Sequence, residues 1–367
     1  MAQEIQLPRP TGSYNVGVSN HFLKDLSRSY NGEKGRSLLV RIYYPSAQAH
    51  KEYPLYLSDT MHLYKEKIVR TYNVSPEDLD YLDKIRDWAM PDALIDAQNT
   101  SFPVLFFSHG FLMAAQLYSL LIEEMASHGY VVIAINHTDA CWPVMFPDGS
   151  SPAILPELAN IFSNKERSCM QTFDLIQETW TKDVEFVLSW LRNQPLTKFL
   201  DLSRMGIFGH SFGGSTATEA ARQYNDFKAM ANLDGMLFGP NWGKPFETPS
   251  LFVVAEKQLT HEEALNAGLS IDQCDSLLAR CSKTIFDQYK DNAFYVTVKN
   301  TDHASFVDSK LIKSPLSKNR NNPLEGIKIA RALLVDFFDR YLQSKNLTHL
   351  LTSQSPDIVV TKKYKSC

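Results

Sequence analysis

A serine with small neighbours stands at the centre of the run Gly209-His210-Ser211-Phe212-Gly213-Gly214. The run follows a predicted strand over Arg204–Phe208 and precedes a predicted helix over Phe212–Gln223, which is the context that a G-x-S-x-G nucleophile motif requires. Because such a serine occupies a strained, tight turn, its neighbours must have almost no side chain. The pattern predicts that Ser211 is a nucleophile above a sheet edge and that the backbone N–H of Phe212 is directed into the same space.

Partners for this serine follow it in the sequence. A serine hydroxyl is a weak nucleophile that needs a base, and the motif places its partners in the order Ser, Asp or Glu, His. His303 lies in a polar loop between the last predicted strand and the final predicted helix, so we expect it to be the base. Asp234 ends the strand after the serine helix, and Glu256 ends the next strand. Either carboxylate could orient the imidazole, and Asp234 is preferred over Glu256.

A second loop is expected to help hold the negative charge that develops during attack on a carbonyl. Ser108-His109-Gly110-Phe111-Leu112 directly follows a predicted strand over Val104–Phe107, as the His-Gly loops of esterases do. The backbone N–H groups of Phe111 and Phe212 would then form the oxyanion hole. Apolar residues that follow predicted strands are candidates for the wall of an acyl pocket: Leu112, Trp142, Met236, Leu237 and Phe238.

The elements that position these residues alternate between strand and helix from about residue 100 onward. Predicted strands are Leu38–Tyr43, Val104–Ser108, Tyr130–Asn136, Arg204–Phe208, Ala229–Leu233, Leu251–Ala255 and Ala293–Val298. Predicted helices are Leu117–Ser127, Cys169–Arg192, Phe212–Gln223 and Glu325–Leu342. The near-continuous apolar strands and the alternation favour an α/β fold with a mostly parallel, doubly wound sheet.

We expect one domain over residues 1–345 and a poorly structured C-terminal tail over residues 346–367. A helical, cap-like insertion at about residues 52–101 interrupts the alternating pattern. Ser75-Pro76-Glu77-Asp78 predicts the start of a helix that continues to Ala89. Its apolar face predicts either packing on the core or a cap and lipid-contacting surface, and core packing is the usual role of such a stripe.

Composition excludes several classes of protein. With 37 basic and 41 acidic residues there is no positive excess for nucleic-acid binding. Neither a phosphate loop, a dinucleotide fingerprint nor clustered metal ligands occur, so we expect no metal and no cofactor. The five cysteines have no CxxC spacing and are expected to be reduced. The start resembles no signal peptide and there is no spanning segment, which favours the cytoplasm, with export after removal of a leader or by an unconventional route as the alternative.

The sequence resembles the platelet-activating factor acetylhydrolase family of the plasma and intracellular type II kind. The resemblance rests on Arg41-Ile42-Tyr43-Tyr44-Pro45, Phe106-Phe107-Ser108-His109-Gly110, Ile207–Gly214 and Leu233-Asp234. It implies an α/β-hydrolase fold and calcium-independent release of short or oxidised sn-2 acyl chains from phospholipids. Carried over by position, it implies Ser211 as nucleophile, Asp234 as acid and His303 as base.

Other functions fit the same residues. The nearest alternative is a general carboxylesterase, lipase or polyester hydrolase, because a fold and a triad do not fix a substrate. A binding protein without turnover is the alternative from another class. The expected partners are a phospholipid or other ester substrate and a membrane or lipoprotein surface, with no nucleic acid.

Overall fold

The computed structural model describes residues 5–363 apart from 31, 49–51, 99–100, 139, 153–157, 159–168, 267, 290, 313–322 and 348–354. Ten strands in the described part of the chain form one sheet. Across the sheet they are β12 (Ile358–Lys363), β11 (Ala293–Val298), β10 (Ser250–Ala255), β9 (Phe227–Leu233), β8 (Leu200–His210), β6 (Phe102–Ser108), β7 (Val131–Asn136), β3 (Glu33–Ser46), β2 (Asn15–Tyr30) and β5 (Ala89–Pro91).

The central strands run in one direction. Every neighbouring pair from β7 through β6, β8, β9 and β10 to β11 is parallel. The β2–β3 hairpin and β12 add antiparallel pairs toward the two edges. The chain moves from β6 to β7 on one side and to β8 on the other, so the order reverses beside β6. This confirms the predicted doubly wound, mostly parallel sheet.

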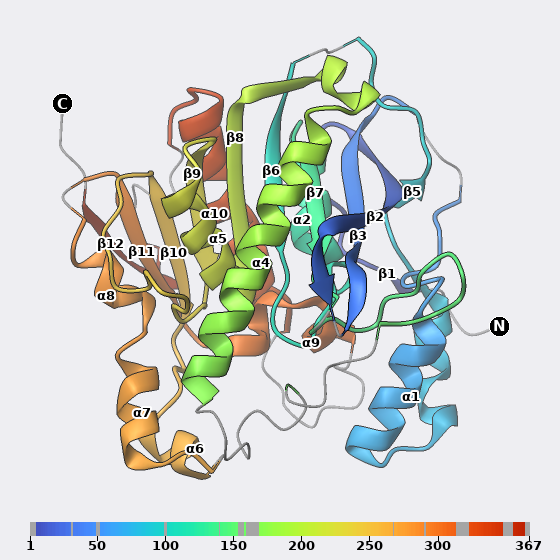
Figure 1. The fold of residues 1–367 in the computed structure, drawn as a ribbon. Coiled ribbons are helices and arrows are strands. Elements are labelled where there is room, and N and C mark those ends of the chain that lie inside the picture. The colour runs from blue at the N-terminus through green and yellow to red at the C-terminus, as the bar shows by residue number, and fades with distance from the viewer. Residues whose placement is uncertain are drawn as a thin grey trace.

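Helices cover both faces of the sheet (Figure 1). Helices α2 (Ser119–Ser127) and α10 (Pro323–Leu342) lie on one face, and α4 (Cys169–Leu191) and α5 (Phe212–Gln223) on the other. In β6, Leu105 and Phe107 pack in the apolar cluster that contains α2 and α10, whereas Val104 and Phe106 pack in the cluster that contains α4 and α5. Since both faces are buried, the strand is apolar at almost every position.

The insertion differs from its prediction. It contains α1 (Met61–Tyr72), which was not predicted, and a 3₁₀ helix, η1 (Pro76–Lys84), where a helix to Ala89 was expected. Leu79 and Leu82 are fully buried, and their spacing of three residues suits a 3₁₀ turn. The helix ends because β4 (Ile85–Arg86) pairs with β1 (Ile5–Gln6), while β5 joins the main sheet. The buried stripe therefore faces the core.

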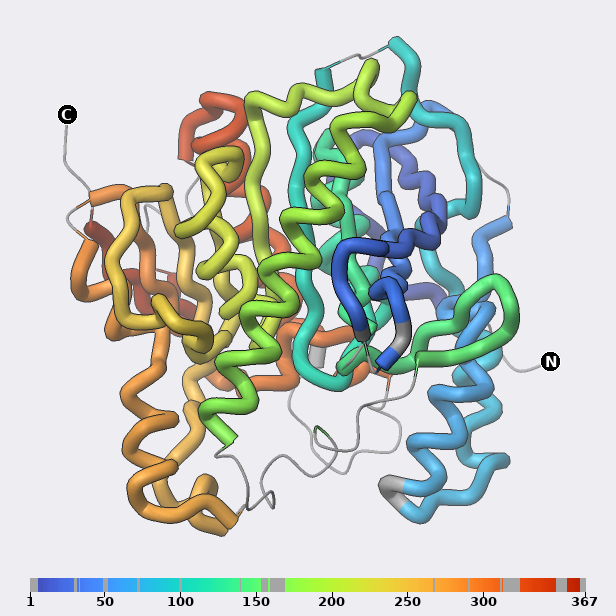
Figure 2. Tube along the Cα trace, in the orientation of Figure 1, coloured from blue at the N-terminus to red at the C-terminus, as the bar shows by residue number. Residues whose placement is uncertain are grey.

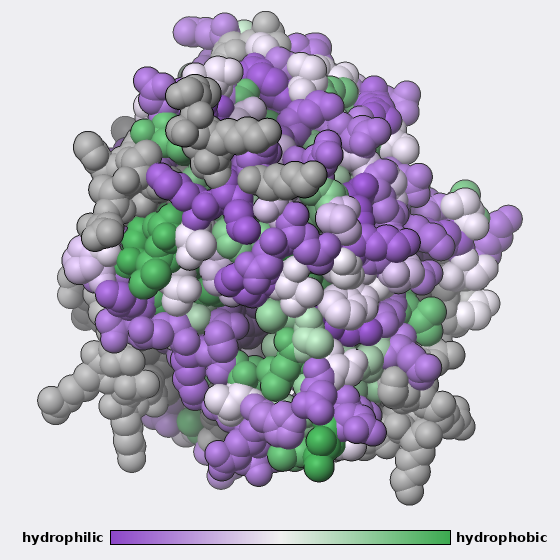
Figure 3. Space-filling view, turned by 90° about the vertical axis from the view of Figure 1, so that its left-hand side faces the viewer, coloured by the Kyte–Doolittle hydropathy of each residue, from purple (hydrophilic) through white to green (hydrophobic). Residues whose placement is uncertain are grey.

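The C-terminal tail also differs from its prediction. It contributes β12, which pairs antiparallel with β11 and places Ile358 opposite Val298. Ile358 is buried, and Lys362 and Lys363 follow on the edge strand. The tube in Figure 2 shows the chain returning to this edge near its C-terminus. Figure 3 views the molecule from this side, which is mainly hydrophilic with a few hydrophobic patches. Charged side chains on an edge strand oppose pairing with other chains.

Most of the short helices lie in the connections that follow the carboxyl ends of parallel strands. They are η2 (Ala115–Tyr118), α6 (His261–Asn266), α7 (Ile271–Leu278), α8 (Ser282–Phe286), η4 (His303–Phe306) and α9 (Asp308–Ile312). A further short helix, η3 (Pro195–Phe199), joins α4 to β8. In Figure 1, α6 and α7 project below the sheet on the left, and α1 projects below it on the right.

Within the described ranges, no helix combines the length and apolar character needed to cross a bilayer. Cys169, Cys274 and Cys281 are free thiols, Cys141 is buried, and Cys367 lies outside the described residues.

Candidate active site

Ser211 occupies a strained turn between β8 and α5. Its φ of 56° and ψ of −124° lie in a region that L-residues rarely adopt. The turn is fixed from both sides, because the Ser211 N–H donates to the Leu233 carbonyl oxygen at 2.8 Å and the Gly214 N–H donates to the Ser211 carbonyl oxygen at 2.9 Å. The predicted strand–turn–helix arrangement is therefore present, and strain of this kind persists only where its surroundings enforce it.

The glycines of the motif are required by close backbone approaches. A Cβ on Gly209 would lie 2.2 Å from the Gly213 carbonyl oxygen, and one on Gly213 would lie 2.0 Å from the Ser108 carbonyl oxygen. These approaches press the start of α5 against the end of β6, which brings the loop after β6 to Ser211. A Cβ on Gly110 would lie 3.3 Å from the Ser211 Cβ. Two loops that the sequence separates by about 100 residues thus meet at one point.

His303 and Asp234 complete a chain of hydrogen bonds with Ser211. His303 Nε2 lies 2.9 Å from Ser211 Oγ, and His303 Nδ1 lies 2.8 Å from Asp234 Oδ2. The first turn of η4 holds His303 in place, because Asp302 and Ser305 exchange hydrogen bonds around it in a capping box. The structure thus brings together the three side chains that the sequence analysis selected as nucleophile, base and acid.

The environment of Asp234 keeps its carboxyl group ionised. Its side chain is 6% exposed, and burial by itself would raise its pKa. The His303 hydrogen bond and charge outweigh burial, together with hydrogen bonds to Asp234 Oδ1 from the Ala255 N–H and Gln258 Nε2, each at 2.9 Å. The pKa of Asp234 is therefore held below its usual value, and a carboxylate faces His303 Nδ1.

Glu256, the alternative acid, has another partner. Its Oε2 accepts a hydrogen bond from the Asn300 N–H at 2.8 Å, and its backbone N–H donates to the Val298 carbonyl oxygen at 3.0 Å. Glu256 therefore braces the loop that leads from β11 to His303. The geometry places Asp234, and not Glu256, against the imidazole.

His210 is part of the site although the sequence analysis gave it no role. Its ring lies 4.6 Å from the His303 ring, and its Nε2–H donates to the His303 carbonyl oxygen at 3.0 Å. Its Nδ1 accepts from the Tyr118 hydroxyl at 2.9 Å, which in turn accepts from the Gly110 N–H at 3.1 Å. Burial, with the nearby charge of His303, lowers the pKa of His210 to about 3, so the ring is neutral. The sequence feature that could have identified His210 is its position between Gly209 and Ser211 in the G-x-S-x-G motif.

The backbone amides of Phe111 and Phe212 are the predicted donors of the oxyanion hole. Neither the Phe111 N–H nor the Phe212 N–H donates a hydrogen bond to any residue that the structure describes. Their neighbours are engaged, since the Leu112 N–H donates to the Ala140 carbonyl oxygen at 2.8 Å. Leu112 has a φ of 59°, and this left-handed conformation shapes the loop around the Phe111 amide. Donors without an acceptor in the described part of the chain are what the predicted oxyanion hole requires.

The predicted pocket residues divide into two groups. Leu112, Met236 and Phe238 pack in the apolar cluster that also contains Phe111 and Phe212. Trp142 instead stacks on Tyr64 of α1, in the apolar cluster that contains α2 and α10. Leu237 is buried in the other main cluster, which contains residues of α4 and α5. The structure thus gathers three of the five beside the candidate oxyanion amides and places Trp142 and Leu237 elsewhere. Among the described residues, no three His, Cys, Asp or Glu side chains are grouped so as to hold a metal ion.

Comparisons with known proteins agree with this geometry. Residues 1–349 match the family model described as platelet-activating factor acetylhydrolase, isoform II. A platelet-activating factor acetylhydrolase from Cavia porcellus is 23% identical over 92% of this chain and 78% of its own length. A probable 1-alkyl-2-acetylglycerophosphocholine esterase from Arthroderma benhamiae is 31% identical over 38% of this chain and 33% of its own. A ferulic acid esterase structure from Streptomyces cinnamoneus, 23% identical, superposes with a TM-score of 0.77 over 98% of this chain and 100% of that one, which confirms the α/β-hydrolase fold.

Proposed function

Because the chain belongs to the platelet-activating factor acetylhydrolase isoform II family and is a serine ester hydrolase, we propose that it releases short or oxidised sn-2 acyl chains from glycerophospholipids. In this proposal Ser211, His303 and Asp234 form the catalytic triad, and no calcium takes part. The observation that carries the proposal is the hydrogen-bonded chain from Ser211 through His303 to Asp234, whose serine lies on a strained turn.

The first half-reaction acylates Ser211. Its Oγ attacks the ester carbonyl carbon while His303 Nε2 accepts the hydroxyl proton. The Asp234 carboxylate holds Nδ1–H in place and stabilises the imidazolium that forms. The Phe111 and Phe212 N–H groups donate to the oxyanion of the tetrahedral intermediate. When the intermediate collapses, His303 returns the proton to the departing alcohol oxygen, and the lysophospholipid leaves.

The second half-reaction releases the acyl group. Water attacks the acyl-serine carbonyl carbon as His303 Nε2 removes one of its protons, and the same two amides hold the second oxyanion. Collapse of this intermediate transfers the proton to Ser211 Oγ and frees the carboxylic acid. The ester is cleaved with no net change in the enzyme.

The apolar cluster at the oxyanion amides supports the choice of an acyl substrate. Phe111, Leu112 and Met236 are partly buried at its surface, so a short hydrocarbon chain can displace water from them. Leu265 on α6 is 40% exposed, and Ile271 on α7 is 63% exposed. Both helices project below the sheet in Figure 1. Exposed apolar side chains beside the site support contact with a lipid surface as part of the proposal.

Substrate profiling tests the proposal. Purified protein in EDTA should hydrolyse 1-alkyl-2-acetyl-glycerophosphocholine and oxidised short-chain phosphatidylcholine, and it should leave an sn-2 palmitoyl chain intact. Ser211→Ala should abolish the hydrolysis. A preference for aryl esters, triglycerides or polyester film over short-chain phospholipids would instead favour a general carboxylesterase, lipase or polyester hydrolase.

A further inference from the structure

We propose that a buried relay, Asp183–His137–Ser108, positions the loop that carries the Phe111 amide and so sets the strength of the oxyanion hole. The proposal rests on the proposed function, since it gives that amide its role. The relay consists of positioning residues, and no hydrogen bond among the described residues joins it directly to the side chains of Ser211, His303 or Asp234.

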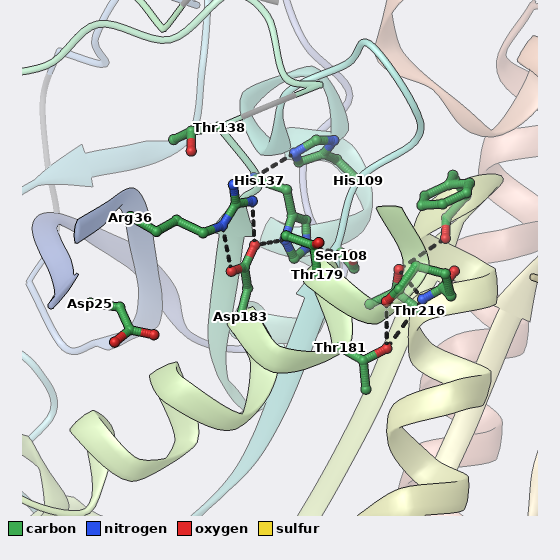
Figure 4. Close-up of polar contacts among 12 residues, drawn as sticks. Asp25, Arg36, Ser108, His109, His137, Thr138, Thr179, Thr181, Asp183 and Thr216 are labelled. Atoms are coloured by element: carbon green, nitrogen blue, oxygen red, sulfur yellow. Dashed lines mark hydrogen bonds and ion pairs between the residues drawn. The ribbon is translucent and has the colours of Figure 1, made fainter. Parts of the chain in front are cut away.

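The relay repeats the residue types of a triad inside the protein. His137 Nδ1 lies 2.8 Å from Asp183 Oδ2, and His137 Nε2 lies 2.8 Å from Ser108 Oγ. Asp183, His137 and Ser108 are completely buried, so no substrate reaches them. Figure 4 shows the Arg36 side chain on the far side of Asp183, where its Nε and Nη2 donate to the two carboxylate oxygens at 2.7 Å each.

The charges fix the direction of the relay. Burial alone would raise the pKa of Asp183, but the Arg36 guanidinium and the hydrogen bond from His137 hold it well below its usual value. A carboxylate accepts only, so His137 Nδ1 carries the proton and donates it to Asp183. In the neutral imidazole, Nε2 is then an acceptor and receives the Ser108 hydroxyl.

His137 also connects two loops through its backbone. Its N–H donates to His109 Nε2 at 3.0 Å, and His109 Nδ1–H donates to the Gly110 carbonyl oxygen at 2.7 Å. Burial lowers the pKa of His109 to about 3, which keeps this ring neutral and able to fill both roles. A shift of His137 therefore moves the peptide unit between Gly110 and Phe111, because the Gly110 carbonyl and the Phe111 N–H belong to the same planar group.

A second path leads from His137 to the next peptide unit, between Phe111 and Leu112. The Ala140 N–H donates to the His137 carbonyl oxygen at 3.2 Å, and the Leu112 N–H donates to the Ala140 carbonyl oxygen at 2.8 Å. Leu112, with its φ of 59°, depends on this bond to stay in the left-handed region. The relay thus holds the Phe111 amide from the residue before it and from the residue after it.

Helix α4 supports both halves of the oxyanion hole. Asp183 and Trp180 lie on the same helix, and the Trp180 ring stacks on the His137 ring with centroids 4.0 Å apart and planes at 8°. The Trp180 ring also packs against the Phe212 ring, with centroids 4.8 Å apart and planes at 85°. One buried helix face therefore positions the loops that bear both candidate amides, which is the kind of preorganisation that oxyanion stabilisation requires.

A carbonyl-¹³C-labelled alkyl trifluoromethyl ketone reports directly on the oxyanion hole. Ser211 Oγ forms a bond to its carbonyl carbon, the hydroxyl proton passes to His303, and a hemiketal oxyanion results. The ¹³C shift followed against pH gives the midpoint of the hemiketal ionisation. In Ser108→Ala we expect this midpoint to rise by about one pH unit, which is a roughly tenfold weaker hold on the oxyanion. We also expect kcat to fall about tenfold to hundredfold, with KM changed by less than about threefold.

Thr181→Val is the matched control. Thr181, labelled in Figure 4, is a buried α4 residue whose hydroxyl donates to the Gln177 carbonyl oxygen of its own helix. Its loss should lower stability without moving the hemiketal midpoint or kcat. If Ser108→Ala does not fold, His109→Gln is the alternative variant. It removes the imidazole that joins the His137 N–H to the Gly110 carbonyl oxygen, and it should also raise the midpoint of the hemiketal ionisation.

The outcomes separate this proposal from the one on which it rests. A ketone adduct on wild-type Ser211 with an unchanged midpoint in folded Ser108→Ala would overturn the relay and leave the proposed function standing. Absence of any adduct on the wild-type protein would overturn the proposed function and the relay with it. A raised midpoint in Ser108→Ala, unchanged in Thr181→Val, would establish the relay.

Discussion

Replacing Asp234 by asparagine is expected to leave the fold intact and remove almost all activity. Asn tolerates the φ of 53° at this position. Its Oδ1 can still accept from the Ala255 N–H and Gln258, which now meet Asp234 Oδ1 at 2.9 Å. The Asn NH₂ group would then occupy the place of Oδ2, which lies 2.8 Å from His303 Nδ1.

The size of the effect follows from the tautomer of His303. An amide NH₂ is a donor, so Nδ1 must become the acceptor and the proton must move to Nε2. Nε2 lies 2.9 Å from Ser211 Oγ and, once protonated, cannot accept the serine proton. An equivalent exchange in the Ser-His-Asp triad of a serine protease costs about 10⁴ in kcat, or about 5.4 kcal/mol of barrier at 1.36 kcal/mol per tenfold.

Hydrolysis of p-nitrophenyl acetate at neutral pH, together with circular dichroism, measures this loss. The matched control is Glu256→Gln, which keeps an acceptor for the Asn300 N–H and should remain within about threefold of wild type. Activity of folded Asp234→Asn within tenfold of wild type would refute the reasoning. So would an equal loss in Glu256→Gln, because it would transfer the role of the acid to that residue.

Three further predictions concern stability and ionisation. Gly213→Ala places a Cβ 2.0 Å from the Ser108 carbonyl oxygen, so unfolding in urea should show a loss of about 1–3 kcal/mol or more, and wild-type stability would contradict the close approach. Burial and the Asp87 carboxylate raise the pKa of buried Glu123 well above its usual value. Because the folded-state pKa is the higher one, this group's contribution is complete below about pH 4 and is lost as pH rises, so Glu123→Gln should flatten the fall in unfolding free energy between about pH 5 and pH 8. If the unfolding free energy of Glu123→Gln fell with pH as steeply as that of the wild type, the raised pKa of Glu123 would be contradicted. Since the pKa of His210 is about 3, its ring signals in ¹⁵N NMR should remain those of a neutral imidazole down to about pH 5, and a titration at about pH 6 would disprove that state.

Local sequence features predicted the parts of the fold that local physics determines. The glycines around Ser211 and the apolar strand before it were sufficient for the strained turn, because that turn forms within a few residues. The strand over Ala293–Val298 was predicted with its bounds, since a buried parallel strand is apolar at nearly every position. The position of His303 followed from the order of the elements.

Contacts between distant segments account for what the sequence could not predict. The choice between Asp234 and Glu256 depends on side-chain direction at two neighbouring strand ends, which spacing does not reveal. β12 forms because β11 offers it an edge, although its own segment is only six residues long and ends in two lysines. The relay joins Arg36 to Asp183 across 147 positions of the chain, and nothing near either residue marks the pair.

Labelling with a fluorophosphonate probe tests the central claim most directly. The probe reacts with a serine hydroxyl that a neighbouring base activates, and tandem mass spectrometry of the modified peptide can distinguish Ser211 from Ser215 four residues later. The account predicts stoichiometric label on Ser211, none in Ser211→Ala, and a slow reaction in Asp234→Asn. Label on Ser215 or on another serine, or none on folded wild-type protein, would contradict the assignment of Ser211 as the nucleophile.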